Sequence, residues 1–163
     1  MKLKLIKAAD FNKLTNAQKR VAIARDVLAR INAKLIKPKD GIFFSNKYDI
    51  EDGKTTVKTF VNKTQCSVCA KGALFCSWVG NFNNFDKEDL WHVNEELGEK
   101  FPEELLNIFG RVMLDSIEYN FEGCHYDWIC KEAVALGSKY GYCHNLEAIM
   151  ENIIDNNGEF VID

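Results

Sequence analysis

The sequence predicts a predominantly helical α+β fold in one compact domain spanning residues 1–163. Several stretches repeat apolar residues at helical spacing and carry capping residues at their ends, whereas only two short stretches are typical of β-strands. The composition is globular, with 47% hydrophobic and 12% aromatic residues and only two prolines. Because 163 residues is near the usual size of one domain, we expect about five helices and a small β-hairpin around one core.

The first predicted helix begins at Thr15 and ends near Lys37 and Pro38. Thr15 and Gln18 have the spacing of a capping box, in which each side chain binds the other residue's backbone amide. Proline disfavours the helical conformation of the residue before it, which ends the helix. The apolar stripe of this helix consists of Ala17, Val21, Ala24, Leu28, Ile31 and Leu35, widened by Val27.

Two stretches after this helix predict a β-hairpin. Residues 38–41 have the composition of a turn, and the apolar residues 42–44 follow them. Residues 55–61 alternate in polarity and are rich in β-branched side chains. We expect these two strands to pair across the loop at residues 48–53.

A central buried helix is predicted for residues 65–79. When these residues are placed on a helix at 100° per residue, the small side chains fall on one side of it. The large apolar side chains occupy most of the remaining surface of the helix. Only Ser67 and Lys71 remain obviously exposed to water. Such a face lets another backbone approach closely, and its members are Cys66, Cys69, Ala70, Ala73 and Ser77.

Four further helices are predicted in the second half of the chain. Residues 86–97 form the first and begin with an acidic residue. Pro102 and the two glutamates after it open the second, whose apolar face extends to Ile117. A third lies near residues 129–139. Asn145 caps the last helix, which reaches Ile154 and ends in the Asn-Asn-Gly of residues 156–158.

Charge is divided unevenly along the chain. The net charge is −3, but residues 1–65 contain 15 Lys and Arg against 6 Asp and Glu, whereas residues 66–163 contain 6 against 18. The two halves can pack together and neutralise each other. Otherwise they leave a basic surface for a phosphate-bearing or acidic partner, or an acidic surface that competes for a basic one.

The location expected from the sequence is the cytoplasm. The first ten residues lack both the apolar stretch and the cleavage site of a signal peptide. No window approaches the length of apolar sequence that a membrane-spanning helix needs. Six cysteines without a secretory signal are typical of thiols in a reducing compartment. We therefore expect no membrane association.

A basic flank of the first helix is the candidate ligand-binding site. Its cations share that flank or border the apolar stripe: Lys19, Arg20, Arg30 and Lys34. Together they suit a phosphate or an acidic peptide. Tyr126 and Trp128 in a later loop would stack on a base if they lie near these cations. The same cations also suit a solvated flank whose long stems cover the edge of the core.

Cys66 and Cys69 form an alternative site. Two thiols one turn apart at a helix start face the same way, and the helix dipole lowers a thiol pKa. For zinc, they would need two more ligands, and the sequence offers two Cys-His pairs: Cys124 with His125, and Cys143 with His144. The other interpretation is structural, because cysteine is among the most often buried residues.

A cysteine-dependent hydrolase is the catalytic version of this alternative. Cys66 would then be the nucleophile, His125 or His144 the base, and Asn145 or Asp127 the orienting group. The chain contains no GxxxxGK[ST], GxGxxG, HExxH or GxSxG motif, and its carboxylates do not pair at a catalytic spacing. We therefore expect a protein without a cofactor that acts by binding.

Five segments of the chain resemble small uncharacterised accessory proteins encoded by tailed phages and prophages. The segments are RVAIARDVL (20–28), CSVCAKGALF (66–75), IEYNFEG (117–123), LEAIMENII (146–154) and GEF (158–160). The resemblance implies a compact protein that binds a host factor, blocks a defence protein or sequesters a nucleotide-like immune signal. It implies no catalytic residue.

The sequence therefore predicts a non-enzymatic, phage-type accessory protein in the host cytoplasm. Its expected partner is a nucleotide-like small molecule or a host defence protein. A homo-oligomer is a further expectation, since the small-residue face of the helix at residues 65–79 would serve as a subunit contact.

Overall fold

The computed structural model describes residues 6–39, 41–46, 56–82, 101–122 and 145–162, and these residues are mostly helical. They contain seven α-helices, one π-helix and three short strands. That residues 1–163 form one domain stays a prediction. In chain order the elements are α1 (Ala8–Phe11), α2 (Asn16–Asn32), β1 (Ile36–Pro38), β2 (Ser45–Asn46), α3 (Val57–Lys63), β3 (Cys66–Val68), α4 (Ala70–Ser77), η1 (Trp78–Phe82), α6 (Glu103–Phe109), α7 (Arg111–Glu122) and α9 (Leu146–Asp155).

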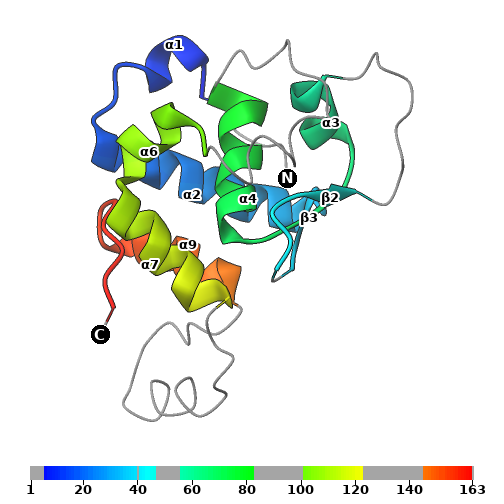
Figure 1. Cartoon of the computed structure of the whole chain (residues 1–163). Coiled ribbons are helices and arrows are strands. Elements are labelled where there is room, and N and C mark those ends of the chain that lie inside the picture. Colours follow the sequence, from blue (N-terminus) through cyan, green and yellow to red (C-terminus); the bar gives the residue numbers. More distant parts are fainter. Residues whose placement is uncertain (1–5, 40, 47–55, 83–100, 123–144, 163) are drawn as a thin grey trace.

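The helix α2 lies at the centre of the described structure. It packs against α9, α4 and α6, while α6 and α7 follow one another down the left side of the view in Figure 1. Ile23 and Val27 of α2, Phe75 of α4 and Ile149 of α9 are completely buried. The buried apolar side chains of all these elements form one continuous cluster.

The sheet has three strands in the order β1-β3-β2. Strand β1 pairs with β3 in parallel, with Ile36 opposite Cys66, and β2 pairs with β3 antiparallel. The predicted hairpin between residues 42–44 and 55–61 is wrong. Residues 57–63 form α3, because the Thr56 side chain accepts a hydrogen bond from the Thr59 amide and the buried Val57, Phe60 and Val61 follow helical spacing.

The capping box predicted at the start of α2 is confirmed, but the helix ends five residues earlier than expected. The Thr15 hydroxyl accepts from the Gln18 amide at 3.3 Å, and the Gln18 side chain accepts from the Thr15 amide at 2.9 Å. At the other end Lys34 has a φ of 60°. The Leu35 amide then donates to the Arg30 carbonyl, which closes the helix and releases residues 36–38 into β1.

The helix predicted for residues 65–79 is only partly correct. Residues 66–68 form the central strand β3, and the α-helix begins at Ala70. The Cys69 side chain caps it by accepting from the Gly72 amide at 3.4 Å. A Cβ on Gly72 would meet the Phe43 carbonyl oxygen at 1.8 Å, so this glycine lets the segment before β2 lie directly against α4.

The described helices in the second half of the chain agree more closely with those predicted from the sequence. The helix expected from Pro102 to Ile117 is divided by Gly110, whose φ is 76°, and Val112 in α7 is 81% exposed rather than buried. Asn145 caps α9 through the Ala148 amide at 3.0 Å, as predicted. The helices predicted for residues 86–97 and 129–139 lie outside the described residues. None of the described helices is long and apolar enough to cross a membrane.

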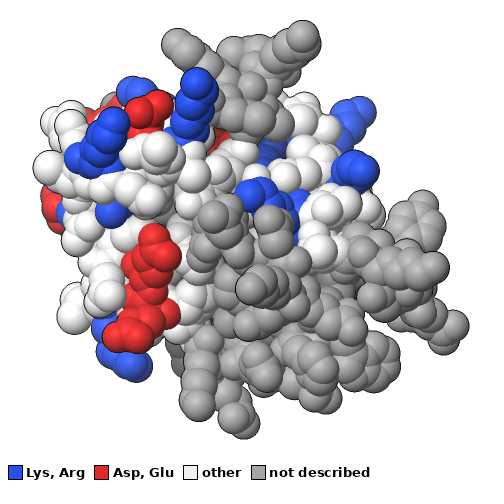
Figure 2. Space-filling view, turned by 90° about the horizontal axis from the view of Figure 1, so that it is seen from above, with Lys and Arg blue, Asp and Glu red and all other residues white. Residues whose placement is uncertain are grey.

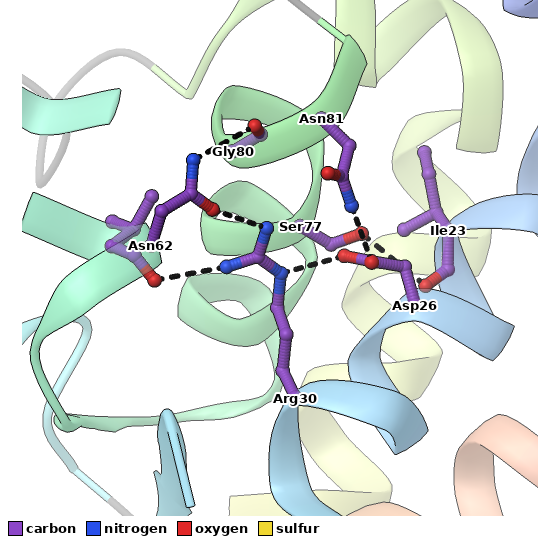
Figure 3. A network of polar contacts seen from close by, with 8 residues as sticks. Ile23, Asp26, Arg30, Asn62, Ser77, Gly80 and Asn81 are labelled. Atoms are coloured by element: carbon purple, nitrogen blue, oxygen red, sulfur yellow. Dashed lines mark hydrogen bonds and ion pairs between the residues drawn. The ribbon is translucent and has the colours of Figure 1, made fainter. Parts of the chain in front are cut away.

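A buried arginine joins three of these elements (Figure 3). Arg30 of α2 is completely buried, and its guanidinium donates to the Asp26 carboxylate at 2.6 Å, the Val61 carbonyl at 2.9 Å and the Asn62 side chain at 2.8 Å. Asn81 of η1 donates to the other oxygen of Asp26. The network therefore links α2 to the end of α3 and to the π-helix.

Gly80 provides the space that this guanidinium occupies. A Cβ at position 80 would lie 2.1 Å from Nη2 of Arg30 and 2.7 Å from Oδ1 of Asn62. The Gly80 carbonyl also accepts a hydrogen bond from the Asn62 side chain at 3.1 Å. Burial of a charge is tolerated only when it is paired and fully hydrogen-bonded, so the absence of a side chain here is a requirement of the network.

Replacing Gly80 with alanine should lower the free energy of unfolding by about 3 kcal/mol, because it disturbs a buried charge pair. The direction of this change is informative, because helix propensity alone would make the alanine variant more stable by about 1 kcal/mol. Urea denaturation measures the change. The control is Gly41→Ala, whose Cβ meets nothing within 4 Å and which should lose only about 1–2 kcal/mol through its positive φ. A loss at Gly80 no larger than the control's would contradict the prediction.

Candidate binding groove

A groove of about 750 Å³ lies among residues 41–43, the start of α4, the start of α6 and one face of α7. Its apolar wall includes Phe43 and Phe101, whose rings meet edge to face with centroids 6.2 Å apart. Its charged wall has four carboxylates and two cations, an excess of two negative charges. The charged residues are Lys71, Glu103, Arg111, Asp115, Glu118 and Glu122.

Lys71 is one of the two cations that line the groove. Its ammonium contacts Asp115 at 3.4 Å and also pairs with Glu118. These carboxylates are three residues apart on α7 and so lie on the same face of that helix. Burial works to lower the Lys71 pKa, but hydrogen bonds and charge from Glu118 and Asp115 outweigh it and raise that pKa. Lys71 therefore stays charged.

Cys69 lies in the wall of the groove beside this charged cluster. Burial is the main cause that raises its pKa to about 12, and the Gly72 amide only partly opposes it. The charges of Glu122 and Glu118 raise the pKa further. A lowered pKa was expected at the start of α4, and the shift is instead upward because burial outweighs the backbone amides there. The thiol stays protonated at neutral pH, so it is a poor nucleophile.

Cys66 and Cys76 lie deeper in the core, and both are 1% exposed. Burial raises the Cys76 pKa well above its usual value, and the neighbouring Cys66 thiol raises it further. Cys66 lies in β3 rather than at the helix start predicted from the sequence. Within residues 6–39, 41–46, 56–82, 101–122 and 145–162, no group of three potential metal ligands comes together.

The cations expected to form a phosphate site do not converge. Arg30 is buried in the network described above, not on an exposed flank. Arg20 pairs with Glu159 at 2.8 Å, and Nζ of Lys19 lies 5.6 Å from the centroid of the Phe11 ring. Lys34 is exposed beyond the far end of α2, about 20 Å along the helix from Arg20.

Several predicted site residues fall outside the described part of the chain. They are the aromatic residues Tyr126 and Trp128, the possible bases His125 and His144, the possible orienting residue Asp127, and the possible zinc ligands Cys124 and Cys143. Asn145, the other possible orienting group, is described and serves as the cap of α9. The base and stacking roles therefore stay predictions.

Acidic and basic side chains lie next to one another on part of the surface. On the face shown in Figure 2, a stripe of acidic side chains lies on the left with basic side chains above it and at its lower end, and further basic side chains lie toward the right. The Arg20–Glu159 pair joins the basic first half of the chain to the acidic second half. Neutralisation between the halves thus occurs at this pair, while the groove keeps its acidic excess.

The groove itself was not predicted from the sequence. Lys71 was expected to be exposed, but nothing in the sequence indicated that Asp115 and Glu118 would lie beside it. A lysine in the first turn of a helix is unfavourable next to the positive end of the helix dipole, and this was the available signal. It indicates that Lys71 needs acidic partners from elsewhere in the chain.

No protein family, curated protein sequence or solved structure matches this chain. The residues that line the groove, with their contacts and charges, are therefore the basis on which a function is inferred.

The raised Cys69 pKa predicts a loss of stability at alkaline pH. The folded state keeps this thiol protonated up to about pH 12, whereas the unfolded thiol ionises near 9. Its contribution is therefore complete below pH 9 and is lost as the pH rises from about 9 to about 12. Relative to Cys69→Ser, whose hydroxyl oxygen replaces the sulfur as the capping acceptor, the wild type should lose about 1–2 kcal/mol between about pH 8 and pH 10.5 in urea denaturation.

Alkylation provides an independent check of the same thiol. Iodoacetamide should modify Cys69 slowly in the folded protein at neutral pH and rapidly in urea, as read by peptide mass spectrometry. Rapid modification of the folded protein, or an equal pH dependence in Cys69→Ser, would contradict a buried and protonated thiol.

Proposed function

We propose that this protein acts by binding rather than by catalysis, and that its ligand is a basic segment of a partner protein held in the groove. The observation that carries this proposal is the composition of the groove, whose lining combines aromatic and aliphatic side chains with an excess of carboxylates. Lysine and arginine side chains combine an apolar stem with a cationic end, so both walls suit them. Charge complementarity of this kind increases the association rate and selects the partner.

A nucleotide-like ligand, the other class expected from the sequence, fits this groove less well. Phosphates would be repelled by Glu103, Asp115, Glu118 and Glu122, with only Lys71 and Arg111 to attract them. On α2, Arg20 and Arg30 already pair with carboxylates of this chain. A nucleotide site would depend on residues outside the described part of the chain, Tyr126 and Trp128 among them.

The cysteine-based alternatives receive less support than binding does. The Cys69 thiol is protonated, and the Cys66 thiol is almost completely buried in the central strand. A nucleophile needs a thiolate that a substrate can reach, and a closed zinc site needs four ligands. Each alternative would also need histidines at positions 125 or 144, outside the described residues.

The resemblance to phage and prophage proteins suggests the class of partner. A phage-type accessory protein in the host cytoplasm would use such a groove to block a host defence protein through one of its basic segments. Because binding occupies that segment, it would compete with the nucleic acid or acidic surface that the segment otherwise contacts. A homo-oligomer is compatible with this role and is not required for it.

A basic peptide tests the proposal directly. Fluorescence anisotropy of fluorescein-labelled (Gly-Arg)₄ should show binding that weakens as salt is raised, because the contacts are ionic. The double substitution Glu118→Gln/Glu122→Gln should weaken binding by about tenfold, corresponding to roughly 1.4 kcal/mol. Both residues line the groove.

The matched control is Glu147→Gln/Glu151→Gln, which removes the same charge from exposed positions on α9. This variant should keep the wild-type affinity within about twofold, since the groove is unchanged. Equal weakening by both double variants would contradict a groove-specific site. Tighter binding of a nucleoside triphosphate than of the peptide would favour the nucleotide-like ligand instead.

A further inference from the structure

Lys71 occupies a position in the groove that suits a cation from another molecule. It is the second residue of α4, where the positive end of the helix dipole disfavours a cation. Its ammonium is nevertheless held between Asp115 and Glu118 of α7. Two carboxylates on one helix face thus converge on a single positive charge supplied by the chain itself.

This ion pair is accessible enough to be exchanged. The Lys71 side chain is 19% exposed, while those of Asp115 and Glu118 are 61% and 37% exposed. Ion pairs between exposed groups are weak, and a lysine stem is flexible enough to carry its ammonium into solvent. Release of Lys71 therefore costs less than release of a fully buried charge would, and it leaves two carboxylates that line the groove.

The aromatic part of the groove lining favours one kind of replacement cation. Phe43 and Phe101 present an aromatic pair that lines the same groove. A guanidinium is planar, stacks on aromatic rings and carries five donors that can bridge two carboxylates. An ammonium offers neither the stacking surface nor the fork of donors.

We propose that Lys71 is an internal competitor for the binding site, and that an arginine side chain of the partner displaces it from Asp115 and Glu118. The inference rests on the proposed function and specifies its anchor. Wild-type affinity is then held down by the chain's own lysine, which admits an arginine-bearing segment and disfavours isolated lysines. The groove thereby discriminates among basic partners instead of binding all of them.

Substitution of Lys71 with methionine tests the competition, because methionine keeps the apolar stem and removes the charge. Lys71→Met should bind labelled (Gly-Arg)₄ about fivefold more tightly than the wild type, the effect of removing one partly exposed ion pair. The control Lys63→Met removes the same charge from an exposed position outside the groove lining and should change affinity by less than about twofold. Thermal melting followed by circular dichroism verifies the fold of each variant, and Lys71→Gln replaces Lys71→Met if the latter does not fold.

The comparison of (Gly-Arg)₄ with (Gly-Lys)₄ tests the anchor. Wild-type protein should prefer the arginine peptide by about threefold, in keeping with one cation–π contact. Equal affinities for the two peptides, or a Lys71 variant that binds no more tightly than Lys63→Met, would overturn the inference while leaving groove binding intact. Failure of the proposed function looks different, because the Glu118/Glu122 variant would then match its α9 control.

Discussion

The buried charge of Arg30 is the constraint on which the rest of the structure depends. A guanidinium without water is tolerable only when its donors are occupied, and Asp26, Asn62 and the Val61 carbonyl occupy them from two directions. This requirement fixes the end of α3 against α2, and it requires a glycine in the π-helix at position 80. A π-helix adds a residue to the turn, which brings Asn81 to the second oxygen of Asp26.

The groove follows from the same arrangement. The π-helix continues α4, so the network that anchors one end of this segment also sets the direction of α4. At its other end the Cys69 cap and the close approach of Gly72 to Phe43 hold the helix start against the segment before β2. Lys71, between these two contacts, faces α7 and meets Asp115 and Glu118. The helix α4 therefore belongs both to the packing around Arg30 and to the lining of the groove.

Some local features could be predicted from the sequence, although the Thr56 cap of α3 was missed, and features that need a distant partner could not. The caps at Thr15 and Asn145 depend on residues three positions away, and both were correct. The end of α2 was missed because Lys34 takes the left-handed conformation usually adopted by glycine. Arg30 was assigned to the surface because its partner Asn62 lies 32 residues further along the chain. The groove required contacts between Lys71 and α7 that no spacing reveals.

Arg30 and Lys71 show how burial decides what an ion pair can do. Both cations pair with carboxylates of this chain, but Arg30 is fully buried and Lys71 is 19% exposed. Removing a partner from a fully buried pair costs about 3–5 kcal/mol, and opening a pair whose members are partly exposed costs less. The binding free energy of a ligand of modest affinity is too small to open the buried pair, but it is large enough to open the partly exposed pair. The Arg30 pair is therefore confined to maintaining the fold, and the Lys71 pair is the one that an incoming cation can replace.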